Sequence, residues 1–113
     1  MRPDLLVAPP RKNRIQQITV STTGAATALI AGVLGLGWVR VKAVTANVQL
    51  YFSTSGSDSV LLNAASGDTC GWPLLAGQTE DYFLTNETHL VWDADGAGSL
   101  YVVRAGQERT NFR

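Results

Sequence analysis

The chain has 113 residues and no formal net charge at pH 7, which fits a single domain built around one hydrophobic core. Charged residues make up only 16% of the chain, and the basic ones are too sparse for the dense positive stripe of a nucleic-acid reader. Cys70 is the only cysteine, so an intramolecular disulfide is excluded and the fold must be stable through packing.

Residues 1–14 predict an extended arm that does not fold alone. They contain three of the four prolines, which remove backbone donors and favour an extended backbone. Their charge balance is 4 − 1 = +3, whereas residues 15–103 have 2 − 7 = −5. The apolar run at 5–8 is too short for a secretory signal and would be exposed on a free arm. We therefore predict that the arm binds a partner through Leu5, Leu6, Val7, Arg11, Lys12 and Arg14.

Residues 15–39 contain no charged side chain, so one alternative is a small membrane protein. Ser, Thr and several glycines interrupt this stretch, and a membrane-spanning helix needs sustained apolarity over about 20 residues. The pattern favours two strands, at 15–21 and 26–31, followed by a glycine-rich corner at 32–37.

After that corner, polar and apolar residues alternate with a period of two, which is typical of half-buried strands. Strands are expected at 38–44 and 47–53, then at 60–62 and 71–75. Pro73 restricts the last of these to the edge of a sheet or the beginning of a strand. The side chains expected to face the core are Val39, Val41, Ala43, Val48, Leu50 and Phe52.

The C-terminal third predicts three more strands, at 79–84, 88–92 and 99–104, separated by turns rich in Gly, Asn and Asp. Short strands at this spacing, without a helical period, indicate an all-β fold. We expect an antiparallel β-sandwich or jelly roll of about eight strands over residues 15–106, after the arm and before a polar tail at 107–113.

No pattern in the chain indicates catalysis, so we predict that the protein is not an enzyme and holds no metal or cofactor. His89 is the single histidine, no metal-binding motif occurs, and Cys70 is expected to be a small buried residue. Glu80 and Asp81 are adjacent on a strand and should face opposite sides. The run Asp93-Ala94-Asp95-Gly96 resembles a fragment of a calcium loop, but a plain turn is the preferred interpretation.

The aromatic residues suggest carbohydrate binding as a second alternative function. Trp38, Trp72 and Trp92, with three tyrosines, are residues from which β-sandwich lectins build sugar-binding platforms. Such residues also fill cores and protein interfaces, and strand parity places Trp92 on the face of Leu90 but Trp38 on that of Arg40.

Three segments carry a resemblance to a known group of proteins: YFSTSGSDSV at 51–60, GWPLLAGQTEDYFL at 71–84 and HLVWDADGAGSLYVVRAG at 89–106. With the basic, proline-rich arm, they resemble the small jelly-roll decoration, or cement, proteins of tailed bacteriophage capsids. The resemblance implies a virion structural protein, made in the host cytoplasm, that sits on the capsid exterior and bridges neighbouring major capsid subunits.

It further implies a homo-oligomer that binds the major capsid protein or another virion protein, with no specific nucleic acid and no membrane as partner. The main alternative is a carbohydrate- or receptor-binding β-sandwich module of a phage tail or fibre.

Overall fold

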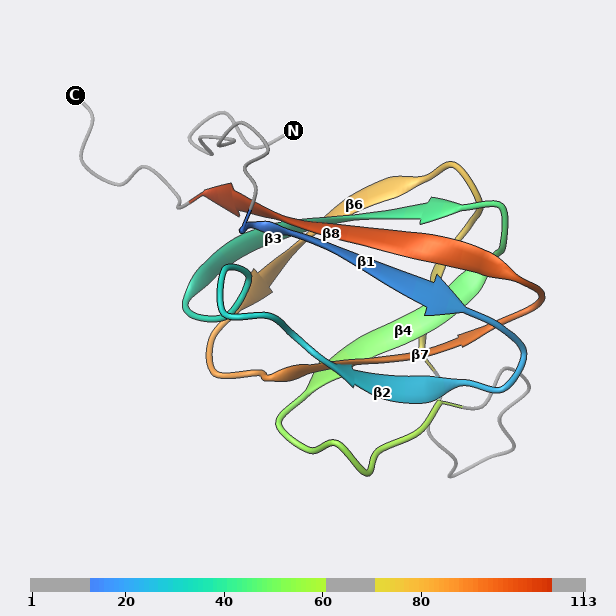
Figure 1. Cartoon of the computed structure of the whole chain (residues 1–113), viewed down its shortest axis with the longest axis horizontal. Helices are drawn as coiled ribbons and strands as arrows, with labels where there is room; N and C mark the ends of the chain where they lie inside the picture. Colours follow the sequence, from blue (N-terminus) through green and yellow to red (C-terminus); the bar gives the residue numbers. More distant parts are fainter. Residues whose placement is uncertain (1–12, 61–70, 107–113) are drawn as a thin grey trace.

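The computed structural model describes residues 13–60 and 71–106, and within these ranges the chain is all-β (Figure 1). The strands are β1 (Ile15–Val20), β2 (Ala25–Ala28), β3 (Gly37–Val44), β4 (Val48–Ser53), β5 (Trp72–Leu74), β6 (Thr79–Leu84), β7 (His89–Ala94) and β8 (Gly98–Gly106). No helix in the described ranges is long and apolar enough to cross a membrane.

The strands form two four-stranded antiparallel sheets, with the orders β1-β8-β3-β6 (sheet 1) and β2-β7-β4-β5 (sheet 2). Hydrogen-bonded ladders join β1 to β8, β2 to β7, β3 to β6 and β4 to β5. This nested pairing of first with last and second with second-last is the topology of a jelly roll. The predicted all-β sandwich is therefore confirmed, and its topology is the jelly-roll form.

The core lies between the two sheets and is formed by alternate residues of each strand. Five of the six side chains predicted to face it are buried, and Phe52 is partly buried and packs against them. Pro73 lies in β5, an edge strand of sheet 2, as its missing backbone donor requires. Strand parity alone thus places these side chains correctly.

Most predicted strands match the structure to within two residues at each end, and two differ by more. The strand expected at 26–31 ends at Ala28, because the Gln16 side chain then takes up the backbone groups of this segment. Its Nε2 donates to the Ala28 carbonyl at 2.9 Å, and its Oε1 accepts from the Ile30 N–H at 3.0 Å. Of the strand expected at 60–62, Val60 is buried but lies outside any strand, and the other residues lie outside the described ranges.

Thr45, in the turn between β3 and β4, has a φ of 78°. A left-handed backbone is costly for a β-branched residue and free of steric cost for glycine. We expect Thr45→Gly to raise the free energy of unfolding by about 1 kcal/mol, measured by urea denaturation. Thr22→Gly, in a turn where no positive φ occurs at this position, is the control and should slightly destabilise the protein. Equal losses in the two variants would contradict the interpretation of Thr45 as strained.

Candidate functional site

The outer face of sheet 1 presents an apolar row of side chains to the surface. Ile15 on β1 pairs with Val103 on β8, and Val103 pairs with Arg40 on β3. In the next row, Tyr101 on β8 lies between Gln17 and Lys42. The antiparallel register therefore brings residues from both ends of the chain onto one surface, called here the open face.

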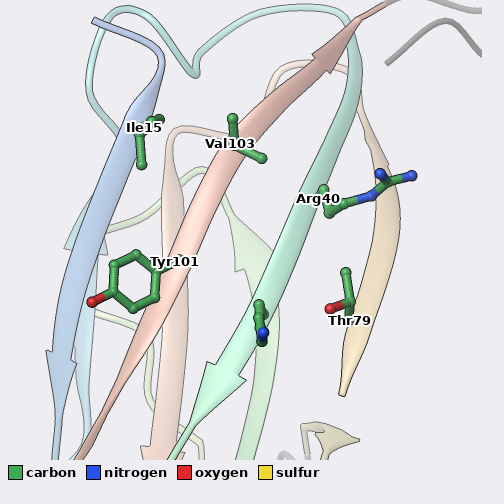
Figure 2. A pocket seen from close by; sticks show the side chains of 6 residues that line it. Ile15, Arg40, Thr79, Tyr101 and Val103 are labelled. Carbon is green, nitrogen blue, oxygen red and sulfur yellow. The ribbon is translucent and has the colours of Figure 1, made fainter. Parts of the chain in front are cut away.

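These two rows enclose a shallow hollow of about 260 Å³. Figure 2 shows that the labelled side chains come from neighbouring strands and surround one space. Ile15 and Tyr101 are 40% and 38% exposed, so the apolar part of the hollow is accessible from outside. The lining residues are Ile15, Arg40, Lys42, Thr79, Tyr101 and Val103.

An ion pair fixes the charged rim of the open face. Arg40 donates from Nε to Asp81 Oδ1 at 2.7 Å and from Nη2 to Asp81 Oδ2 at 2.9 Å. This two-point geometry holds a planar guanidinium in one orientation. The hydrogen bonds that Arg40 donates to Asp81 raise the pKa of Arg40, against the opposing effect of desolvation. The pair confirms that Glu80 and Asp81 act on different sides, because Glu80 pairs with Val41 and not with Arg40.

Two aromatic rings continue the open face toward the start of β3 and the end of β6. Trp38 and Phe83 are register partners, and their ring centroids lie 5.3 Å apart with planes at 72°. This edge-to-face contact is a favourable aromatic geometry. Phe83 is 44% exposed, so the apolar surface of sheet 1 extends from the hollow to these rings.

The outer face of sheet 2 is different, because the loop after β4 folds over it. The Tyr51 hydroxyl donates to the Ser59 carbonyl at 3.3 Å, and a Cβ at Gly56 would lie 3.0 Å from His89 Nε2. Val91, on the outer side of β7, is completely buried. One sheet is therefore covered on its outside by its own chain, whereas the open face of sheet 1 carries exposed apolar side chains.

His89 contacts residues of its own strand end and of the loop after β4. Its Nδ1 lies 2.8 Å from the Thr88 hydroxyl, and its ring packs beside Gly56. Within residues 13–60 and 71–106, no group of three His, Cys, Asp or Glu side chains is arranged to hold a metal ion. Cys70 lies outside the described ranges.

The run from Asp93 to Gly96 contributes to a turn. Both carboxylate oxygens of Asp95 accept hydrogen bonds from Asn47, one from its backbone N–H at 3.0 Å and one from its Nδ2 at 2.7 Å. The preferred interpretation of this run as a turn agrees with these contacts. The bonds between Asp95 and Asn47 link the β7–β8 turn to the β3–β4 turn.

The three tryptophans do not share one platform. Trp92 is 5% exposed and points into the core, where its Nε1 donates to the Thr27 hydroxyl at 2.9 Å. Trp38 lies on the outer side of sheet 1, and Trp72 is 63% exposed on the edge strand β5. The separation follows from strand parity and from the assignment of β3 and β7 to different sheets.

Of the six residues predicted to bind a partner, the structure describes Arg14. It is exposed and directly precedes β1, and its carbonyl accepts a hydrogen bond from the Arg104 N–H at 3.1 Å. Arg14, in the described part of the arm, therefore lies next to Ile15 at the edge of the open face. Leu5, Leu6, Val7, Arg11 and Lys12 lie outside the described ranges.

Sequence reasoning did not identify the open face, although one signal for it is present. The run Leu100-Tyr101-Val102-Val103 places apolar side chains on both sides of β8, and of these only Leu100 and Val102 are buried. A strand that is apolar on both sides, in a sandwich with one layer on each side of the core, has a second apolar face to cover. Tyr101 and Val103 form that face.

Comparison with known proteins found no family model, curated protein or solved structure that matches the chain.

Proposed function

We propose that the chain is a non-enzymatic virion structural protein, a capsid decoration or cement protein that bridges neighbouring capsid subunits. The open face of sheet 1 is the surface through which it contacts its partner. The observation that carries the proposal is the exposed apolar hollow of Ile15, Tyr101 and Val103 on an ordered sheet, beside a fixed ion pair. A rigid apolar surface rimmed by polar groups is typical of a protein-binding site.

The capsid assignment has two supports. One is the resemblance of three segments and of the basic arm to phage decoration proteins. The other is the nested strand pairing, since jelly rolls occur in viral capsid proteins and in lectins. Architecture alone does not define function, so the partner surface has to be argued from the open face itself.

The chemistry of the open face defines the partner. Apolar burial contributes roughly 25 cal/mol per Å², whereas an exposed ion pair contributes at most about 1 kcal/mol. The Arg40 guanidinium is already bound to Asp81. Lys42 is exposed, and we expect it to be the cation that contacts the partner. The expected partner surface is apolar at its centre, with an acidic group opposite Lys42.

The test uses the double variant Tyr101→Ser, Val103→Ser in a binding assay with particles of the virus that carries the gene. Both side chains lie on the outside of β8, so the core is unchanged, and we expect the dissociation constant to rise at least about tenfold. The control is the double variant Ile30→Ser, Leu36→Ser, which removes side chains that are 37% and 59% exposed and that belong to the loop between β2 and β3.

Raised salt should weaken attachment much less than the double variant does, because the contact is mainly apolar. Unchanged binding of the Tyr101, Val103 variant, or absence of the chain from the particles, would contradict the proposal.

A further inference from the structure

A second surface lies on the side of the sandwich where the edge strands β5 and β6 end their sheets. There, a hollow of about 440 Å³ is lined by Trp72, Pro73, Leu75, Gln78 and Glu80, and is called here the edge hollow. We propose that the edge hollow binds residues 1–12 of a second copy of this chain, so that copies join head to tail through their arms.

The apolar residues of the edge hollow are exposed but held in place. Trp72 and Leu75 are 63% and 51% exposed. The turn that carries Leu75 is closed by its carbonyl, which accepts from the Gln78 N–H at 2.8 Å, and by its N–H, which donates to Gln78 Oε1 at 2.9 Å. Asn47 Oδ1 accepts from the next backbone N–H, that of Ala76, at 2.9 Å. An exposed apolar surface on a fixed turn loses little conformational entropy on binding.

Glu80 gives the edge hollow its charge. It pairs with Val41, whose side chain is completely buried, so Glu80 lies on the inner side of sheet 1 at its open edge. Among the described residues, none forms an ion pair with it. An inward-facing charge on an edge strand opposes unspecific pairing with another sheet. An occupant with a positive charge would instead be attracted to the Glu80 carboxylate.

Residues 1–12 have the matching chemistry. Their charge balance is 3 − 1 = +2, from Arg2, Arg11 and Lys12 against Asp4. Between the prolines lies the run Leu5-Leu6-Val7, which supplies apolar side chains for Trp72 and Leu75. An extended segment of this length spans up to about 40 Å, enough to reach from one copy to the next.

The position of Arg14 favours a second copy as the source of the arm. The arm leaves beside β1, whereas the edge hollow borders β6, and β8 and β3 lie between these strands in sheet 1. An arm that bound its own edge hollow would have to pass from the β1 edge of the sandwich to its β6 edge. Exchange between copies removes this constraint, and the resulting contact joins two different surfaces, which generates rings or chains.

The inference is tested by sedimentation of the purified full-length chain, without any capsid protein. Trp72→Ala with Leu75→Ser, and separately Leu5→Ser with Leu6→Ser and Val7→Ser, should each raise the dissociation constant of self-association at least about tenfold. Leu36→Ser, which changes an equally exposed leucine away from the hollow, should leave self-association unchanged. Self-association that persists in the Trp72, Leu75 variant would overturn the proposal.

Mixing the two defective proteins supplies a sharper test. One keeps an intact arm and the other an intact hollow, so the mixture should form a complex of two chains and nothing larger. Glu80→Lys should also weaken self-association, and Arg11→Glu with Lys12→Glu in the same chain should restore it. Failure of both the mixture and the charge reversal would show that the arm does not occupy this hollow.

A synthetic peptide of residues 1–12 identifies the occupant directly. Added to the full-length Leu5, Leu6, Val7 variant, it should change the tryptophan fluorescence, and the response should be lost when Trp72→Ala is added. Arm protection from protease in a strictly monomeric wild-type chain would place the arm on its own domain and overturn the exchange. A glycan that binds at Trp72 and is not displaced by the peptide would equally overturn it.

These outcomes are separate from those of the proposed function. Tyr101→Ser with Val103→Ser should raise the dissociation constant for particles at least about tenfold while leaving self-association unchanged. The edge-hollow variants should weaken self-association, which is measured in the absence of particles, and they leave the open face intact.

Discussion

Trp92→Ala should lower the free energy of unfolding by about 3–5 kcal/mol. The side chain is 5% exposed and belongs to the cluster between the sheets. Its Nε1 donates to the Thr27 hydroxyl at 2.9 Å, which ties the central strand β7 to the edge strand β2. The substitution therefore creates a cavity and removes a hydrogen bond between two strands.

Urea denaturation at a protein concentration where the chain is monomeric provides the measurement. Trp72→Ala is the matched control, because this side chain is 63% exposed and should contribute less than about 0.5 kcal/mol to the monomer. Trp92→Phe keeps most of the buried ring but not the hydrogen bond, and should cost about 1 kcal/mol. Similar losses for the Trp92 and Trp72 alanine variants would contradict the assignment of Trp92 to the core.

Asn47→Ala should lower the free energy of unfolding by about 2–3 kcal/mol. The side chain connects three turns at one end of the sandwich, since Nδ2 donates to Asp95 Oδ2 at 2.7 Å and Oδ1 accepts from the Ala76 N–H at 2.9 Å. The first of these bonds involves a charged acceptor, which makes it the stronger one. Alanine keeps the backbone donor to Asp95 but removes both side-chain bonds.

Asn86→Ala is the control for this variant and should change stability by less than about 0.5 kcal/mol. Asn86 lies in the β6–β7 turn, and its side-chain oxygen accepts one long hydrogen bond, of 3.3 Å, from the Thr85 hydroxyl. Thermal and urea unfolding should rank the two variants in the same order. A loss for Asn86→Ala as large as that for Asn47→Ala would show that the link between turns contributes nothing.

Several local features of the fold can be predicted from the sequence. The alternation from Val39 to Ala43 predicts which side chains of β3 face the core, and the structure confirms it. Pro73 predicts an edge strand, which β5 is. Both succeed because side-chain parity and the missing proline donor are properties of the backbone at the residue concerned.

Other features depend on contacts between residues far apart in the chain. Ile15 pairs with Val103, and this pairing assembles the open face. Alternation assigns a side chain to one of two sides of its strand, but it does not indicate which strand lies next to it. The same limit applies to the end of β2, which depends on Gln16 in another strand.

Composition and alternation are thus enough for an all-β sandwich with a basic, proline-rich arm, because they act through local backbone geometry. The nested strand pairing, the loop that covers sheet 2, and the exposure of Tyr101 beside Ile15 follow from the packed structure. The physical reason is that the burial of an outer face depends on what another part of the chain places over it. For Val91 that cover is present, whereas Tyr101 remains 38% exposed.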